Sequence, residues 1–263
     1  MDSEFAAKTV LVAYLFAAAG IILWQAIRNR DGWQVWLLYV IDRTYLGLMY
    51  HWRANRRCPI PANGPGIVIA NHRSPLDPLI VWNNHHLSED SRQIRVIGFL
   101  MAREYYERPI VHWISRNLRS IPLERDGRDM KPIRDALTIL KEGGLVAVFP
   151  EGQINKEHGM LEGNTGVAWL ALKAQVPVYP VYVHNAPQGN TMIEPFFTPV
   201  RVRVSYGDPV DLSAYYGRRK SQELLREVAD LLMHHLALAG AEIEEPADAT
   251  DPRETLQMNR ETG

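Results

Sequence analysis

A histidine and an aspartate five residues apart form the strongest candidate for catalysis in the chain. His72 follows the apolar run 67–70, which predicts a buried strand, and Asp77 stands in the next segment. That segment predicts a helix, with Ser74 as its cap and Pro75 in its first turn. A histidine just outside a helix N-terminus and an aspartate just inside it can meet. Asp77 would then hold one ring nitrogen of His72 and leave the other free to remove a proton from a hydroxyl.

Two further groups of charged residues also follow predicted strands. The apolar run 145–149 is followed by a proline, Glu151 and Gly152, and the short segment 119–125 ends at Arg125. In an α/β sheet, reactive groups gather where strands end and helices begin. Each group alone also fits an ordinary structural role. Arg125 could form a surface ion pair, Glu151 could cap a turn and Gly152 could provide a bend.

The order of the apolar segments predicts an α/β fold with a mixed, largely parallel sheet flanked by helices. The expected strands span residues 67–70, 95–99, 120–123, 145–149, 178–183 and 200–205. The expected helices span residues 75–86, 110–117, 130–142, 165–175 and 221–239. For helix 130–142, Asp129 is the expected cap, Pro132 lies in the first turn and Gly143-Gly144 ends the helix.

The N-terminal residues predict a membrane-binding helix pair that precedes this fold. Residues 9–27 carry no formal charge, and as a helix they would extend roughly 28 Å, close to the thickness of a bilayer core. Arg28 and Arg30 follow this segment and favour the cytoplasmic side for the rest of the chain. Residues 33–52 are rich in tryptophan and tyrosine but too polar to span. We expect this second helix to lie in the headgroup region, with packing on the soluble domain as the alternative.

Composition excludes several classes of protein. The formal net charge is -1, so the chain lacks the excess positive charge that is typical of nucleic-acid-binding proteins. Cys58 is the single cysteine, which excludes an internal disulfide and argues against a cysteine-based metal site. The pairs His85-His86 and His234-His235 are sequence neighbours that diverge by about 100° on a helix. We therefore predict no metal site.

The charged groups, taken in order, resemble the motifs of the PlsC-like glycerolipid acyltransferases, the 1-acylglycerol-3-phosphate acyltransferases and their relatives. The family motifs are N-H-x-x-x-x-D, an arginine after a short strand, F-P-E-G and a V-P-V-x-P-V-like strand. The matching residues are Asn71, His72 and Asp77, then Arg125 with Arg103 upstream, then Phe149 to Gly152, and finally Val176 to Val181. The resemblance covers about residues 60–211.

This resemblance implies the transfer of a fatty acyl group from a thioester to a lysophospholipid hydroxyl, above all from 1-acylglycerol-3-phosphate to phosphatidate. His72 would be the general base, and Asp77 would fix its tautomer and stabilise the imidazolium. No cofactor is implied, because acyl-coenzyme A or an acyl carrier protein thioester is a co-substrate. Ser74 is not in a G-x-S-x-G elbow, so an acyl-serine intermediate is not expected.

The resemblance also implies an acceptor site. Arg125, with Arg103 as second choice, would hold the acceptor phosphate, and Glu151 and Gly152 would shape the acceptor pocket. The partners implied are membrane lipids, the lysophospholipid and the acyl donor, on the cytoplasmic face of a membrane. The expected organisation is residues 1–57 as membrane-anchoring helices, 58–240 as the acyltransferase domain and 241–263 as a disordered acidic tail.

The chain departs from the family in the third motif. The family commonly continues T-R-S there, and its arginine is thought to help hold the acceptor phosphate, whereas this chain has Gln153-Ile154-Asn155. Lys156 or Lys173 could substitute, although a lysine cannot copy the forked contact of a guanidinium. A lysophospholipid-remodelling acyltransferase of the tafazzin kind, which carries a similar Glu-Gly-x-x-Asn sequence, therefore remains the alternative.

Two other classes are disfavoured by particular residues. A metal-dependent hydrolase built on His72 and Asp77 would need ligand spacing such as H-E-x-x-H, which the chain lacks. A catalytically inactive lipid-binding module would need a broken pair, whereas here both His72 and Asp77 are present.

Overall fold

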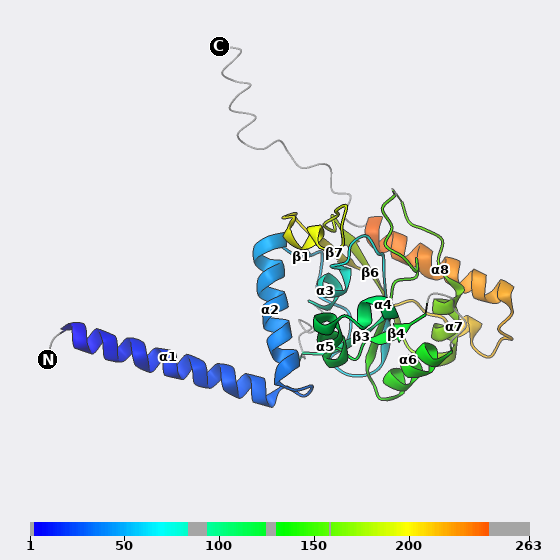
Figure 1. Cartoon of the computed structure of the whole chain (residues 1–263). Coiled ribbons are helices and arrows are strands. Elements are labelled where there is room, and N and C mark those ends of the chain that lie inside the picture. The colour runs from blue at the N-terminus through cyan, green and yellow to red at the C-terminus, as the bar shows by residue number, and fades with distance from the viewer. Residues whose placement is uncertain (1–2, 84–93, 125–129, 158, 242–263) are drawn as a thin grey trace, which may run out of the picture.

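A seven-stranded, largely parallel sheet forms the centre of the protein. The computed structural model describes residues 3–83, 94–124, 130–157 and 159–241. The strands are β1 (Arg53–Ala54), β2 (Gly66–Ala70), β3 (Ile97–Ala102), β4 (Ile121–Leu123), β5 (Leu145–Val148), β6 (Val178–His184) and β7 (Arg203–Tyr206). Their spatial order is β1-β7-β6-β2-β5-β3-β4, and only β6 and β7 pair antiparallel among them (Figure 1). The predicted fold class is confirmed.

Helices cover both faces of this sheet. The helices are α1 (Ser3–Arg28), α2 (Trp33–Tyr50), α3 (Asp77–Trp82), α4 (Arg103–Tyr106), α5 (Pro109–Asn117), α6 (Lys131–Lys141), α7 (Thr165–Ala174) and α8 (Gln222–Ala241). Two short 3-10 helices, η2 (Glu194–Phe197) and η3 (Ser213–Tyr215), follow β6 and β7. The strand side chains alternate, so that Val68 packs with α2 and α3, whereas Ile67 and Ile69 pack with α6, α7 and α8. The result is three layers, with β2 buried on both faces.

The helix ends show where local sequence decided the structure. At the end of α6, the Gly144 N–H donates to the Ile139 carbonyl and the Gly143 N–H to the Leu140 carbonyl, as the glycine pair predicted. Asp129, the expected cap, lies outside the described residues. Helix α3 begins at Asp77, not at Pro75, and the expected extension to residue 86 also lies outside the described residues.

Ser74 was predicted to cap α3, and this is wrong. The N-cap position is Leu76, which makes no side-chain cap. The Ser74 hydroxyl instead accepts a hydrogen bond from the Leu76 N–H at 3.3 Å, inside the turn that precedes the helix. The proline in the first turn is Pro78, because Pro75 also belongs to that turn. The turn is longer than predicted because its main chain folds around the side chain of Asp77.

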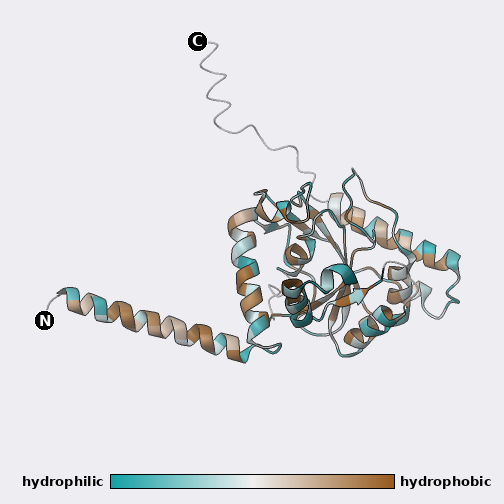
Figure 2. Ribbon diagram, viewed as in Figure 1, coloured by the Kyte–Doolittle hydropathy of each residue, from teal (hydrophilic) through white to brown (hydrophobic). Residues whose placement is uncertain are grey.

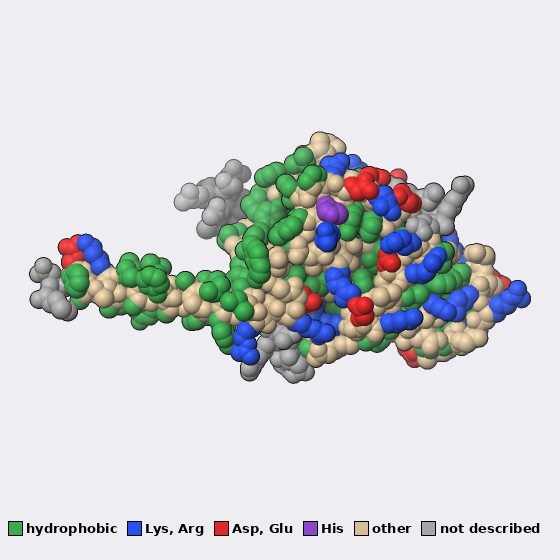
Figure 3. Space-filling model, turned by 60° about the horizontal axis from the view of Figure 1, so that its bottom comes forward, with side chains coloured by type: hydrophobic (Ala, Val, Ile, Leu, Met, Phe, Trp, Pro, Cys, Tyr) green, Lys and Arg blue, Asp and Glu red, His purple; other side chains and the backbone are tan. Residues whose placement is uncertain are grey.

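Helix α1 extends away from the domain, and its apolar side chains are exposed (Figures 1 and 2). Residues 4–28 are long enough and apolar enough to cross a membrane, by length and composition alone. Apolar side chains cover α1 and the adjoining side of the domain, whereas charged side chains gather farther from α1 (Figure 3). This distribution suits a protein that is associated with a membrane on its α1 side.

Helix α2 carries apolar side chains both on the face that packs on the domain and on the face that is exposed. Its inner face buries Val35 and Leu46 in the domain core, while Ile41 and Leu48 are exposed on its outer face. Two tyrosines near its C-terminal end fix the neighbouring η2. The Tyr45 hydroxyl donates to the Phe196 carbonyl at 2.5 Å, and the Tyr50 hydroxyl donates to the Pro195 carbonyl at 2.7 Å. Helix α2 is therefore attached to η2 by two hydrogen bonds and to the sheet by core packing.

Candidate active site

The candidate residues lie at the C-terminal edge of the parallel strands. Asn71 and His72 follow β2, Glu151 follows β5, and Arg103 follows β3. Asn71 fixes the point where the chain leaves β2, because its side-chain amide accepts from the Val183 N–H at 2.7 Å and donates to the Val183 carbonyl at 3.0 Å. These two bonds extend the pairing of β2 with β6 by one residue. His72 therefore starts from a rigid point in the middle of the sheet.

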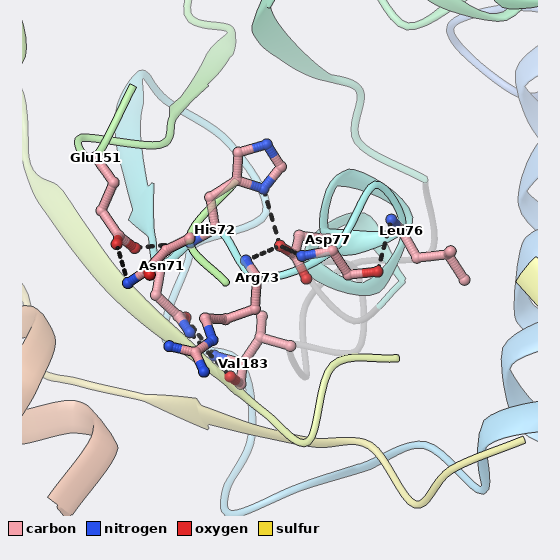
Figure 4. A network of polar contacts seen from close by, with 9 residues as sticks. Asn71, His72, Arg73, Leu76, Asp77, Glu151 and Val183 are labelled. Carbon is pink, nitrogen blue, oxygen red and sulfur yellow. Dashed lines mark hydrogen bonds and ion pairs between the residues drawn. The ribbon is translucent and has the colours of Figure 1, made fainter. Parts of the chain in front are cut away.

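His72 and Asp77 are in contact, as their spacing predicted (Figure 4). The distance from His72 Nδ1 to Asp77 Oδ2 is 2.9 Å, and Asp77 is fully buried. The same Oδ2 accepts the main-chain N–H groups of Arg73 at 2.6 Å and Ser74 at 2.7 Å. Since a carboxylate only accepts, Nδ1 carries the ring proton, and Nε2 is left with a lone pair. Nε2 makes no hydrogen bond to any residue that the structure describes.

The imidazole is held flat against an aromatic side chain. The His72 ring stacks on Phe149, with centroids 4.1 Å apart and planes 16° apart. Phe149 in turn stacks on Phe99 from β3, at 5.9 Å. The His72 side chain is 17% exposed, so one side of the ring remains accessible. The stack fixes the ring plane and keeps water from one face, which suits a base that must meet a hydroxyl in one direction.

Glu151 and Asn155 hold the main chain of His72 from both sides. The His72 N–H donates to Glu151 Oε1 at 2.9 Å, and the Asn155 N–H donates to the His72 carbonyl at 2.7 Å. Asn155 Nδ2 also donates to Glu151 Oε2 at 2.9 Å, and Oε2 accepts the Leu161 N–H at 3.0 Å. Both Glu151 and Asn155 are buried. The described contacts of Glu151 are thus with the loop that carries His72 and with residues 155 and 161, and its part in an acceptor pocket stays a prediction.

Asn155 was not predicted as a site residue: the sequence showed that this stretch lacks a cation and carries a Glu-Gly-x-x-Asn sequence, but assigned Asn155 no role. No local pattern marks it, because its contact with His72 depends on β5 lying beside β2. Gly152 has a φ of +72°, while a Cβ there would meet nothing within 4 Å. The glycine is needed for the left-handed bend that turns Asn155 back toward His72.

The side chains predicted to bind the acceptor phosphate differ in their surroundings and in whether the structure describes them. Arg103 starts α4 on the surface and forms ion pairs with Glu124 and, at 3.7 Å, with Glu107. The hydrogen bond that Arg103 donates to the Glu124 carboxylate raises the pKa of Arg103. Arg125 lies outside the described residues. Lys173 is in the last turn of α7, which runs from the catalytic edge to the opposite edge of the sheet, so it cannot substitute for a cation at His72.

A cavity of about 490 Å³ lies beside the His72 turn. Its lining comes from Arg73 and Pro75, from Ile154 and Lys156, and from residues 188–195 after β6. Lys156 is therefore the one of the two substitute lysines that lies near the catalytic loop. Cys58 is buried, and burial raises the pKa of its thiol to about 11, which does not suit a nucleophile.

Comparison with known proteins agrees with this geometry. A family model described as Acyltransferase matches residues 53–184, which is half of the chain and includes both His72 and Glu151. The chain belongs to the PlsC-like acyltransferase family. A solved structure, that of the 1-acyl-sn-glycerophosphate acyltransferase PlsC from Thermotoga maritima, has a similar fold, with a TM-score of 0.65 over 92% of this chain and 95% of that one at 21% identity.

Curated acyltransferases also match parts of the chain. A putative 1-acyl-sn-glycerol-3-phosphate acyltransferase from Caenorhabditis elegans is 30% identical over 122 residues, 45% of this chain and 40% of that protein. The 1-acyl-sn-glycerol-3-phosphate acyltransferase alpha of Ovis aries is 27% identical over 70% of this chain and 62% of its own length. A 1-acyl-sn-glycerol-3-phosphate acyltransferase from Pseudomonas aeruginosa is 25% identical over 72% of this chain and 74% of its own length. The match thus covers less than two thirds of the first two relatives.

Proposed function

We propose that this PlsC-like protein is an O-acyltransferase that moves a fatty acyl group from a thioester to a lysophospholipid hydroxyl. The proposed acceptor is 1-acylglycerol-3-phosphate, and the product is phosphatidate. The observation that carries the proposal is the contact of His72 Nδ1 with the buried Asp77 carboxylate. That contact leaves Nε2 as a base on the accessible side of the ring. The names of the matched relatives support the same acceptor.

The chemistry needs one base and no covalent enzyme intermediate. His72 Nε2 takes the proton of the acceptor hydroxyl while the oxygen attacks the thioester carbonyl. The carbon–sulfur bond then breaks, and the thiolate leaves with the proton that His72 returns. Asp77 stabilises the imidazolium between these two proton transfers. Phe149, stacked on the ring, keeps the imidazole aligned with the attacking hydroxyl.

The membrane supplies the acceptor in this proposal. Helix α1 is exposed and apolar, and Arg28 at its end favours the cytoplasmic face for the domain. Exposed Trp33, Ile41 and Leu48 on α2 would lie against the lipid surface beside it. A lysophospholipid in that leaflet can then reach His72 without leaving the membrane.

The acceptor phosphate is assigned first to Arg125 and second to Arg103, and Glu151 and Gly152 would border its pocket. Arg103 would have to open its ion pair with Glu124 in order to bind a phosphate. Ile154, where the family carries an arginine, is apolar. This residue favours the second candidate function, a remodelling acyltransferase that uses a lysophospholipid with another headgroup.

The test is acyl transfer by the detergent-purified protein. The assay uses labelled acyl-coenzyme A, and separately acyl carrier protein, with lysophosphatidate, glycerol 3-phosphate, lysophosphatidylcholine and lysocardiolipin. We expect product from lysophosphatidate, and a loss of about 10²–10⁴-fold in turnover for His72→Ala. Product from another lysolipid alone would select the remodelling function. No product with either donor, or full activity in His72→Ala, would contradict the mechanism.

The phosphate assignment has its own test. Arg125→Ala should raise the acceptor KM by roughly tenfold or more, because a charge-assisted contact to phosphate is lost. Arg103→Ala should have a smaller effect, since its guanidinium already pairs with Glu124 and Glu107. Steady-state kinetics with varied lysophosphatidate measure both. An unchanged acceptor KM in Arg125→Ala would show that the phosphate is held elsewhere.

A further inference from the structure

Two cations at the cavity beside the His72 turn have no carboxylate partner among the residues that the structure describes. They are Arg73, which directly follows His72, and Lys156, which directly follows Asn155. The Asn155 N–H donates to the His72 carbonyl, so the two cations sit on the two loops that meet at the catalytic histidine. The cavity is therefore built into the catalytic loops and is not a remote surface hollow.

The Arg73 guanidinium is held in place from one end. Nη1 donates to the Glu157 carbonyl at 2.5 Å and to the Gly159 carbonyl at 3.1 Å. Nε and Nη2 make no hydrogen bond to the described residues and remain as a pair of donors. Figure 4 shows the guanidinium extending away from the imidazole of His72. A planar guanidinium fixed at one nitrogen is oriented to bind an oxyanion with the others.

The charge balance of the cavity differs from that around Arg103. Its one lining carboxylate among the described residues is Glu194, which is already engaged because Oε2 accepts the Asn190 N–H at 2.7 Å. The rest of that wall, including Gln188 and Thr191, offers amide and hydroxyl groups. Arg103, by contrast, is neutralised by Glu124 and Glu107. Two cations against one carboxylate leave the described lining with a net positive charge, and neutral donors add to it, which favours an anion.

We propose that this cavity binds the phosphate-ester group of one of the two substrates, through Arg73 and Lys156. The inference rests on the proposed acyl transfer. Both substrate classes carry such a group: the lysophospholipid in its headgroup, and the thioester donor in its phosphopantetheine arm. The cavity volume of about 490 Å³ has room for either one. It lies on the β6 side of His72, whereas Arg103 follows β3 on the other side.

Lys156→Gln is the variant of choice, because Arg73 also holds the loop carbonyls of Glu157 and Gly159. Lys173→Gln is the matched control, since it removes the same charge at the opposite edge of the sheet. For each protein, kcat/KM is measured with lysophosphatidate and acyl-coenzyme A. The measurement is repeated with monoacylglycerol, which lacks the acceptor phosphate, and with an acyl-pantetheine, which lacks the donor phosphates.

We expect Lys156→Gln to lose roughly tenfold in kcat/KM with the phosphate-bearing pair, and Lys173→Gln to match wild type. If the loss disappears with monoacylglycerol, the cavity holds the acceptor headgroup, and if it disappears with acyl-pantetheine, it holds the donor arm. An equal loss with every substrate, or no loss, would overturn the inference. Absence of transfer by the wild-type protein would instead refute the proposed function.

Discussion

Two buried carboxylates in this protein differ in their hydrogen bonds, although Asp77 Oδ1, like both oxygens of Asp42, has no partner among the described residues. Asp77 starts α3, and its Oδ2 accepts hydrogen bonds from His72, Arg73 and Ser74. Asp42 lies in the middle of α2, and neither of its oxygens has a hydrogen-bond partner among the described residues. Burial raises the pKa of Asp42 well above its usual range, against a weaker opposing effect of Arg43. The turn at His72 supplies hydrogen-bond donors to its buried carboxylate, and the middle of α2 supplies none among the described residues.

Burial alone does not indicate function in these two aspartates. Both aspartates are almost fully buried, at 0% and 5% exposure. What distinguishes Asp77 is the two main-chain N–H groups that point at its carboxylate, which make it an orienting partner for an imidazole. Asp42 lacks such donors among the described residues, and burial raises its pKa, which favours the neutral form.

The largest effect should come from removing the charge at Asp77. Asp77→Asn keeps the shape of the side chain but no longer fixes the tautomer of His72 or stabilises its imidazolium. We expect turnover to fall by about 10²–10⁴-fold. Asp42→Asn is the matched control, and its turnover should equal that of wild type. Single-turnover acyl transfer measures both. Comparable losses in the two variants would contradict a specific role of Asp77 in turnover.

A smaller effect should follow from loosening the loop that holds His72. Asn155→Ala removes the bonds to Glu151 Oε2 and to the Gly159 carbonyl, so the loop no longer holds His72 in one position. We expect kcat to fall by about 10–100-fold, with little change in the KM of either substrate. Asn164→Ala is the control, because Asn164 only caps α7 through the Gly166 N–H. A fall in kcat of equal size in Asn164→Ala would point to general destabilisation.

The smallest effect concerns stability and depends on pH. A raised pKa means that folded Asp42 binds a proton that the unfolded chain has released, so the wild type loses stability as pH rises from about 4 through the raised pKa. Asp42→Asn removes this loss. We expect its Tm to exceed that of wild type by about 2–4 °C at pH 8 and by less at pH 5. Differential scanning calorimetry in detergent measures the difference, and a pH-independent difference would refute the explanation.

Short-range patterns predicted the strands well because each is an apolar run bounded by turn residues. β2 and β5 differ from their predicted bounds by one residue, since the whole run is buried in the sheet. The contact of His72 with Asp77 was also predictable, because only the four residues of one turn separate them. The prediction that Ser74 caps α3 was wrong, because the Asp77 carboxylate accepts the main-chain N–H groups of that turn.

Long-range pairings were beyond local patterns. The contact of Asn155 with His72 requires β5 beside β2, and the ion pair of Arg103 with Glu124 requires β4 beside β3. Strand order decides both contacts, and the spacing of motifs along the chain does not predict strand order. The short strand β1 and the four-residue helix α4 were missed for a related reason, since each is too short to show a period.

The two tyrosine bonds from α2 to η2 have a mechanical consequence. Tyr45 and Tyr50 tie the helix that follows α1 to the segment Glu194–Phe197, and Glu194 and Pro195 are part of the cavity wall. With α1 in a bilayer, the protein and not the lipid then sets the height of that wall above the membrane plane. Acceptors of different chain length would present their hydroxyl at one level. For the proposed membrane-borne acceptor, the search would then be two-dimensional, with only lateral diffusion and orientation about the membrane normal left.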